Sequence, residues 1–251
     1  MPQGRSIFKQ GIKKALRIKD SEVGSGNEEF RMNWIINSIK KLPAGGRLLD
    51  AGAGEQKFKK YCGHLQYVSQ DFAQYDPAKH DSGLQMDKWD YTGLDIVSDI
   101  IAIPEPDNSF DAILCVEVIE HIPDPARVFP EFSRLLKPGG ILILTAPFCS
   151  LTHFAPYHYS TGFSRFYYEK HLPDHGFEIT ELTENGNYFE YLAQEVRRLP
   201  QIAEKYAGMD QKGFDKLTAN HFLQMLDKMS KADKGSNELL CFGILIVARK
   251  K

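Results

Sequence analysis

A short apolar run that ends in a glycine turn constrains this chain more than any other segment. Two leucines lead into Asp50, and Gly52 and Gly54 follow in alternation. The apolar run predicts a buried strand over residues 47–51, and the glycines predict a sharp turn at its carboxyl end, where a ligand can lie against the backbone. We therefore expect the binding site of the protein to be built around this turn.

Strand and helix patterns alternate along the chain around this turn. The expected strands cover residues 47–51, 67–71, 95–99, 110–116 and 141–145, and the expected helices cover 28–41, 58–65 and 125–136. Strands joined in this way pair in parallel through right-handed crossovers, so we expect an open α/β sheet with helices on both faces. Two later strands, at 178–182 and 239–248, are separated by expected helices at 188–206 and 214–230.

The composition is that of a folded domain without a strong charge field. The chain has 251 residues, of which 42% are apolar and 25% charged, and its formal net charge is −2. These values exclude disorder as the main state and give no basic field for holding nucleic acid, so no nucleic-acid partner is expected. We expect residues 1–26 to form a basic N-terminal helix and linker, and residues 27–251 a single domain with a helical insertion at about 187–236.

Residues 1–20 differ in charge from the rest of the chain. They hold six basic residues against Asp20, a sum of +5, with apolar residues at helical spacing. This pattern favours a helix packed on the domain, and a peripheral contact with an anionic membrane surface is the alternative. The four cysteines are isolated, and no apolar run reaches the roughly 20 residues of a membrane helix, so we expect a cytoplasmic protein with reduced thiols.

The residues around the turn narrow the chemistry of the ligand. No third glycine follows at the spacing of dinucleotide sites, and Asp50 would repel a pyrophosphate but attract a sulfonium or ammonium group. Asp71, at the end of the next expected strand, can accept the two hydroxyls of a ribose. Asp99 and Ile100 offer a carboxylate for an exocyclic amine and a flat apolar surface for adenine. A cation, a ribose and an adenine together describe S-adenosylmethionine.

Five segments resemble, in order and spacing, the motifs of class I S-adenosylmethionine-dependent methyltransferases. They are residues 50–55, Asp71, Asp99, residues 109–125 and residues 135–140. The resemblance implies a Rossmann-like fold, with a mostly parallel seven-stranded sheet, an antiparallel C-terminal edge strand and helices on both faces. It implies S-adenosylmethionine as cofactor, bound by Asp50, Ala51, Gly52, Ala53, Gly54, Asp71, Phe72, Asp99, Ile100, Val116 and Glu117.

The loop after the fifth expected strand, residues 146–160, is dense in histidine and tyrosine. It resembles a bacterial subgroup of these methyltransferases that is associated with glycan and other small-molecule biosynthesis. A hydroxyl acceptor loses a proton on methylation, so a base beside the donor would help, and His153 and His158 are the candidate catalytic residues. We therefore expect methyl transfer to a small-molecule or glycan-like acceptor, most readily at oxygen.

Three alternatives stay open. Glu117, Glu120 and His121 are similar to the metal-binding segment of ubiquinone-pathway O-methyltransferases, with one of the two loop histidines as a further ligand. Many metal-free relatives carry the same segment, so a site without metal is expected and a metal-assisted reaction is the alternative. A dinucleotide-dependent oxidoreductase would share the fold. A non-catalytic subunit would bind the donor and dock a partner through residues 188–230, and the same helices could form a homodimer.

Overall fold

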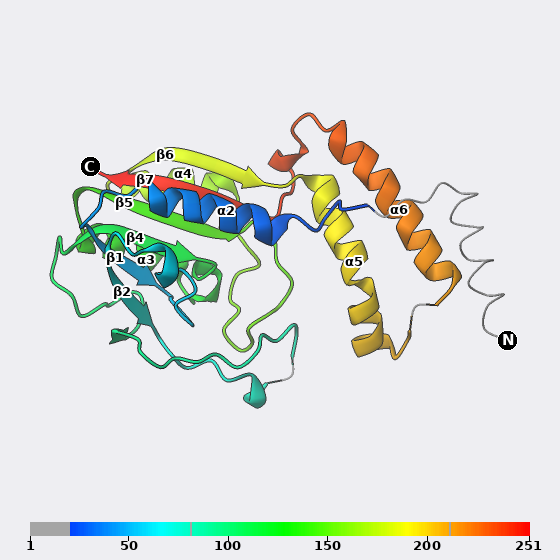
Figure 1. The fold of residues 1–251 in the computed structure, drawn as a ribbon, viewed down its shortest axis with the longest axis horizontal. Coiled ribbons are helices and arrows are strands. Elements are labelled where there is room, and N and C mark those ends of the chain that lie inside the picture. The colour runs from blue at the N-terminus through cyan, green and yellow to red at the C-terminus, as the bar shows by residue number, and fades with distance from the viewer. Residues whose placement is uncertain (1–20, 81, 211) are drawn as a thin grey trace. The chain divides into compact units, whose positions relative to one another are not determined.

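The computed structural model describes residues 21–80, 82–210 and 212–251. Two compact units make up this part of the chain (Figure 1). Residues 29–185 and 242–251 form the first, here called the sheet unit, and residues 21–28 with 186–241 form the second, the helical unit. The candidate site described below lies entirely within the sheet unit.

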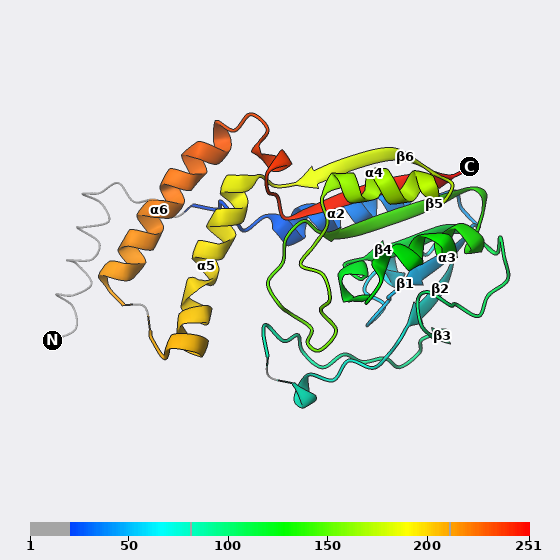
Figure 2. The same cartoon turned by 180° about the vertical axis from the view of Figure 1, so that it is seen from behind.

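A seven-stranded sheet forms the centre of the sheet unit. Figures 1 and 2 show it from two sides. Its strands are β1 (Arg47–Ala51), β2 (Gln66–Asp71), β3 (Ile96–Val97), β4 (Phe110–Val116), β5 (Leu136–Pro147), β6 (Phe177–Asn185) and β7 (Gly243–Lys250). Their spatial order is β3-β2-β1-β4-β5-β7-β6. Neighbours among β1 to β5 pair in parallel, whereas β7 runs antiparallel to both β5 and β6.

This topology confirms the predicted Rossmann-like fold with a mostly parallel seven-stranded sheet. The antiparallel C-terminal strand is β7, which lies between β5 and β6, so that β6 is the outermost strand of the pair at this edge. Strand β3 is shorter than predicted. It stops after Val97 because the following chain turns, with Asp99 Oδ1 accepting the N–H of Ile101 at 3.1 Å.

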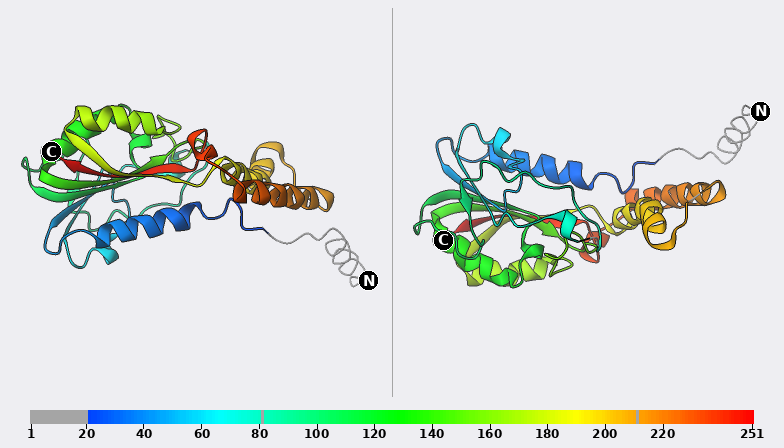
Figure 3. Two further views of the ribbon diagram at one scale, coloured as in Figure 1. Left: turned by 90° about the horizontal axis from the view of Figure 1, so that it is seen from above. Right: turned by 90° about the horizontal axis from the view of Figure 1, so that it is seen from below.

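Helices cover both faces of the sheet, as predicted (Figure 3). α2 (Asn27–Lys40) lies on one face, and α3 (Val128–Leu135) and α4 (Arg165–Asp174) lie on the other. α2 contributes Ile35 and Ile39, both fully buried, to a core cluster that also contains side chains of β1, β4 and β5. This packing holds the strand ends that carry the site.

The prediction of a helix at residues 58–65 is wrong. The segment forms only a single 3-10 turn at Lys59–Tyr61. Phe58 and Cys62 are its only buried residues. One buried pair, four positions apart, gives a single turn a face to pack, and it is too little apolar surface to stabilise a longer helix.

The helical unit contains α5 (Tyr188–Ala207) and α6 (Phe214–Lys231), which stand in the chain between β6 and β7, where two helices are expected. Asn187 begins α5 because its side-chain oxygen accepts the N–H groups of Phe189 and Glu190, both at 3.0 Å. The unit has a small core made of Val23, Ala193, Leu223 and Leu226. The domain boundaries and the homodimer inferred from the sequence stay predictions.

The basic helix predicted for residues 1–20 lies outside the described residues, and so does the membrane contact predicted for it. Among the helices that the structure describes, none has the length and apolar character needed to cross a membrane.

Candidate cofactor and acceptor site

A cavity of about 410 Å³ lies where the parallel strands end. Residues at the carboxyl ends of β1 to β4 line it, together with parts of two long loops. Four predicted cofactor-binding residues, Asp50, Ala51, Ala53 and Gly54, form the strand end and the turn behind the cavity and do not line it. The other seven line it: Gly52, Asp71, Phe72, Asp99, Ile100, Val116 and Glu117.

Asp71 connects the glycine turn to the cavity. Its Oδ2 accepts the N–H of Gly54 at 2.9 Å, and its Oδ1 accepts the N–H of Ala73 at 2.8 Å. Burial raises the pKa of Asp71, and the backbone N–H bonds partly oppose this rise. Each carboxylate oxygen keeps a second lone pair, so Asp71 can still accept two hydroxyl groups from a ligand in the cavity.

Asp50 acts from beneath the turn. It is 2% exposed, and the Tyr67 hydroxyl donates a hydrogen bond to its Oδ2 at 2.6 Å. Burial is the main reason why the pKa of Asp50 rises to about 7. Because Asp50 does not line the cavity, its attraction for a cationic ligand would act across the turn and not by contact.

The end of the cavity at Asp99 and Ile100, away from the glycine turn, suits a flat heterocycle with an exocyclic amine. Ile100 is buried beside it, and Asp99 is exposed, with one carboxylate oxygen taken by the N–H of Ile101. Gln70, which the sequence analysis missed, also lines the cavity. Its Nε2 donates to the Ser98 carbonyl at 2.7 Å, and its Oε1 is buried without a hydrogen-bond partner in the described chain. A ligand amine could satisfy that oxygen.

Four aromatic side chains on two loops form one wall of the cavity. This aromatic wall consists of Phe72 and Trp89 from the loop between β2 and β3, and Phe154 and Tyr157 from the loop after β5. Tyr75 supports it by stacking on Phe154, with ring centroids 3.8 Å apart. Phe72 is among the cofactor-binding residues predicted from the sequence, whereas Trp89 and Phe154 were not predicted, because they lie in loops without periodic patterns.

Two backbone hydrogen bonds join these loops. The N–H of Leu84 donates to the Thr152 carbonyl at 2.9 Å, and the N–H of Phe154 donates to the Leu84 carbonyl at 3.1 Å. Leu84 and His153 thereby form an isolated parallel bridge. The loop that covers the predicted donor site is therefore coupled to the loop that carries the predicted base.

Three imidazole rings gather beside the aromatic wall. The ring centroids of His121 and His153 are 4.8 Å apart, and those of His153 and His158 are 4.9 Å apart. Of the three, His121 lines the cavity. Burial, more than its histidine neighbours, lowers the pKa of His121 to about 3. The ring of His121 is thus neutral, and it suits a ligand role better than that of a base.

The two histidines predicted as catalytic differ in their contacts. His153 Nδ1 bonds to the Leu151 carbonyl at 2.9 Å, which makes Nδ1 the protonated nitrogen and leaves Nε2 with a lone pair. His158 instead places Nε2 at 3.2 Å from the Ser150 hydroxyl. The structure therefore brings both histidines to the same cluster, and neither of them lines the cavity itself.

Glu120 is fully buried at the base of this cluster, and neither carboxylate oxygen has a hydrogen-bond partner in the described chain. Its Oε1 lies 3.7 Å from Nε2 of His121. Glu120, His121 and His153 place one potential metal-ligand atom each within 4.8 Å of one another. A buried carboxylate without a partner is costly, so a cation would satisfy a need that the chain itself leaves open.

Glu117 is already engaged, in contrast to Glu120. Its Oε1 accepts the Thr145 hydroxyl at 2.8 Å, and its Oε2 accepts an Arg31 N–H at 2.9 Å. Its backbone has a φ of 54°, a left-handed conformation that is uncommon for glutamate. These contacts hold Glu117 at the edge of the cavity and away from a role as metal ligand.

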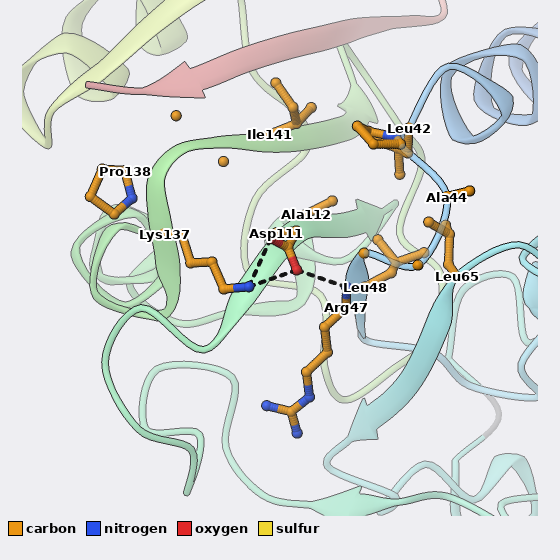
Figure 4. A pocket seen from close by; sticks show the side chains of 15 residues that line it. Leu42, Ala44, Arg47, Leu48, Leu65, Asp111, Ala112, Lys137, Pro138 and Ile141 are labelled. Carbon is orange, nitrogen blue, oxygen red and sulfur yellow. Dashed lines mark hydrogen bonds and ion pairs between the residues drawn. The ribbon is translucent and has the colours of Figure 1, made fainter.

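A second cavity, of about 510 Å³, lies at the amino ends of β1 and β4 and contains no predicted site residue (Figure 4). Asp111 organises it by accepting hydrogen bonds from Lys137 Nζ at 2.8 Å and from the N–H of Arg47 at 2.9 Å. In open α/β sheets, ligands bind at the carboxyl ends of the strands, so the first cavity is the candidate site.

Comparison with known proteins agrees with this geometry. A family model for the methyltransferase domain matches residues 31–183, more than half of the chain. The chain belongs to the methyltransferase-domain family. This confirms the predicted family and enzyme class, with S-adenosylmethionine as the cofactor that goes with them, and it removes the reason for the oxidoreductase alternative.

Individual relatives match part of the chain. The ubiquinone biosynthesis O-methyltransferase of Xanthomonas axonopodis pv. citri is 37% identical over 122 residues, which cover 46% of this chain and 48% of that protein. That of Leptothrix cholodnii is 29% identical over 119 residues, covering 46% and 50%. The match thus spans about half the length of these curated relatives. A Galdieria sulphuraria protein, assigned as a sarcosine dimethylglycine methyltransferase, has a similar fold, with a TM-score of 0.52 at 18% identity and coverage of 88% and 86%.

Proposed function

We propose that this protein transfers the methyl group of S-adenosylmethionine to an oxygen atom of a small molecule. The main support for this proposal is the position of Asp71. Its carboxylate accepts a hydrogen bond from the glycine turn, and it also lines the cavity between the turn and Asp99. A ligand that spans the cavity would meet the turn, a hydroxyl acceptor and an amine acceptor in the order of the parts of S-adenosylmethionine.

Two observations support oxygen as the acceptor atom. The curated relatives with which the chain shares about half of their length are named O-methyltransferases. We assign to His153 the proton that a hydroxyl loses as the methyl group moves to it, because the Nε2 of its neutral ring carries a lone pair and the ring packs against His121, which lines the cavity. A glycan-like acceptor is one form of this proposal, and a ring hydroxyl that packs on the aromatic wall is the other.

A metal-assisted reaction is the second candidate, and the unpartnered carboxylate of Glu120 favours it. The residues present fit a divalent cation, which Glu120, His121 and His153 would hold. The contact from His121 Nδ1 to the Tyr157 carbonyl directs Nε2 toward Glu120, which is the usual orientation of a ligand histidine. A bound divalent cation supplies Lewis-acid chemistry, because it lowers the pKa of a coordinated hydroxyl.

Calorimetric titration with S-adenosylmethionine tests the donor site. Asp71→Ala is expected to weaken binding about 10- to 100-fold, since it removes the acceptor for two hydroxyls. Asp76→Ala is the matched control, because Asp76 lies five positions later and caps the short 3-10 turn Pro77–Lys79 outside the cavity. Equal affinities for the wild type and Asp71→Ala would contradict the proposed donor site.

The acceptor is then sought with the donor bound. Candidate hydroxyl compounds of aromatic and of sugar type are incubated with the protein and the donor, and the products are analysed for a methyl ether by mass spectrometry. Turnover of one type alone decides between the two forms of the proposal. Donor binding with no turnover of either type, by the intact chain, would favour the non-catalytic subunit instead.

A further inference from the structure

One indole ring covers the glycine turn of the donor site. A Cβ atom added to Gly54 would lie 2.8 Å from Cζ3 and 3.0 Å from Cε3 of Trp89, so the six-membered part of the indole sits directly over this glycine. Trp89 also lines the cavity. If the turn holds the methionine part of the donor, as proposed, the ring borders the end of the ligand that carries the sulfonium.

Trp89 is held in place by other rings. Its centroid lies 5.0 Å from that of Phe154, 5.9 Å from that of Tyr75 and 6.2 Å from that of Tyr91. Neighbours on several sides fix the orientation of the indole before a ligand arrives. A fixed aromatic ring loses little conformational entropy on binding.

The charges that line the cavity also suit a cation. Three carboxylates line it, those of Asp71, Asp99 and Glu117, and the last is paired with Arg31. None of the described residues that line the cavity is a lysine or an arginine. An aromatic ring together with carboxylates is the arrangement by which proteins recognise methylated cations.

We propose that Trp89 recognises the positive charge of the donor sulfonium through a cation–π contact, so that the site discriminates between the methyl donor and its demethylated product. The inference rests on the proposed function. In the transfer the acceptor oxygen forms a bond to the methyl carbon and gives its proton to the base, while the bond between sulfur and methyl breaks. The electron pair of that bond stays on sulfur, and the sulfur becomes a neutral thioether. The cation–π contact is lost at that moment, which favours exchange of the product for a new donor molecule.

The test compares two ligands that differ in the charge on sulfur. The dissociation constants of S-adenosylmethionine and S-adenosylhomocysteine are measured by calorimetry for the wild type, Trp89→Leu and Trp89→Phe. Trp89→Leu is expected to weaken binding of the charged donor by about 5- to 30-fold more than binding of the neutral product. Trp89→Phe keeps a ring with a weaker quadrupole and is expected to give an intermediate ratio.

Trp34→Phe is the matched control. Trp34 is the other tryptophan of the chain, and it donates its Nε1–H to Glu181 at 2.7 Å, outside the cavity lining. Its replacement is expected to leave the ratio of the two dissociation constants unchanged. In this variant Trp89 is also the sole tryptophan, so its fluorescence should respond to the charged donor more strongly than to the product.

The outcomes separate the inference from the function on which it rests. If both ligands lose affinity equally in Trp89→Leu, Trp89 acts only by packing and the inference is wrong, while the donor site stands. If the folded wild type binds neither ligand, the proposed function fails and the inference fails with it. A fluorescence signal of Trp89 that responds equally to both ligands would also argue against recognition of the charge.

Discussion

The hydroxyl of Tyr67 donates a hydrogen bond to Asp50 Oδ2 at 2.6 Å, directly beneath the glycine turn. Burial raises the pKa of Asp50 from 3.8 to about 7, the bond from Tyr67 opposes this rise, and the charge of Asp71 adds a smaller increase. The turn that shapes the donor cavity therefore rests on a carboxyl group that ionises near neutral pH in the folded chain.

Asp50→Asn is expected to flatten the pH dependence of stability. Because the pKa of Asp50 is higher in the folded chain, the folded state binds more protons than the unfolded state between about pH 4 and 7. The protonated Asp50 therefore contributes its full share to the free energy of unfolding below pH 4. This share is lost as the pH rises through 7, and the free energy of unfolding falls by at most about 1.4 kcal/mol per pH unit. Asparagine does not titrate, so the free energy of unfolding of the variant should rise relative to that of the wild type from pH 5 to 8.

Urea unfolding at several pH values measures this effect, and Tyr67→Phe supplies a second check. Removing the Tyr67 hydroxyl takes away the hydrogen bond that lowers the pKa of Asp50. The loss of stability should then extend to higher pH than in the wild type. Unfolding free energies of the wild type and Asp50→Asn that run parallel from pH 5 to 8 would rule out a titrating Asp50.

The glycine turn and its acidic partners could be predicted because each follows a strand end. Adjacent parallel strands bring their carboxyl ends together, so chain position alone placed Asp71 and Asp99 near Gly52. The aromatic wall could not be predicted in this way. Trp89 and Phe154 lie in loops without periodicity, and they meet only because a backbone bridge joins those loops.

Helix α4 was not predicted from the sequence, for a different reason. Tyr168 and Leu172 are fully buried in it, but Phe166 is 70% exposed. Aromatic residues on both its buried and its exposed side hide the apolar stripe by which a helix is recognised. His121 was predicted only as a ligand in the metal-assisted alternative, and not as a residue of the donor cavity, because no pattern shows whether a histidine beside a buried glutamate faces a ligand or the core.

Gly83→Ala is expected to uncouple the two loops of the site. Gly83 has a φ of +70°, and a Cβ atom there would lie 2.5 Å from the Thr152 carbonyl oxygen, next to the bridge made by Leu84. We expect about 1–2 kcal/mol of backbone strain, relieved by opening of the bridge, and weaker donor binding. Thermal unfolding and calorimetry measure the two effects.

Gly63→Ala is the matched control for this prediction. Gly63 lies outside the site, and a Cβ atom there would meet nothing within 4 Å. Its stability should change by no more than about 0.5 kcal/mol. Donor affinity that falls equally in both variants, or in neither, would mean that the bridge does not shape the donor site.

Glu120→Gln is expected to abolish metal binding if the metal-assisted reaction is correct. In the wild type, Mg²⁺, Mn²⁺ or Zn²⁺ should raise the unfolding temperature, because an ion that binds only the folded state stabilises it by about 2.7 kcal/mol at one hundred times its dissociation constant. Glutamine is neutral and a weak ligand, so the shift should vanish. Chelation should lower the activity of the wild type in the same experiment series.

Glu117→Gln distinguishes the two glutamates. Both oxygens of Glu117 already accept hydrogen bonds, from Thr145 and Arg31, so this variant should keep the metal-induced shift. A wild type whose unfolding temperature ignores all three ions, and whose activity ignores a chelator, would leave His153 as a base without metal.

The ion pair between Arg31 and Glu117 should stabilise the edge of the cavity more than a surface pair of the same type. Its atoms are 2.9 Å apart, and its side chains are 24% and 26% exposed. The pair Arg165 and Glu169 has a distance of 2.7 Å but exposures of 47% and 38%. Because less solvent reaches the inner pair, its charges are screened less. Double-mutant cycles with Arg→Met and Glu→Gln should therefore give a coupling of about 1–2 kcal/mol for the first pair and about 0.3–0.5 kcal/mol for the second. Equal couplings would mean that water reaches the inner pair as freely as the outer one, and that Glu117 is held by Thr145 and by its backbone alone.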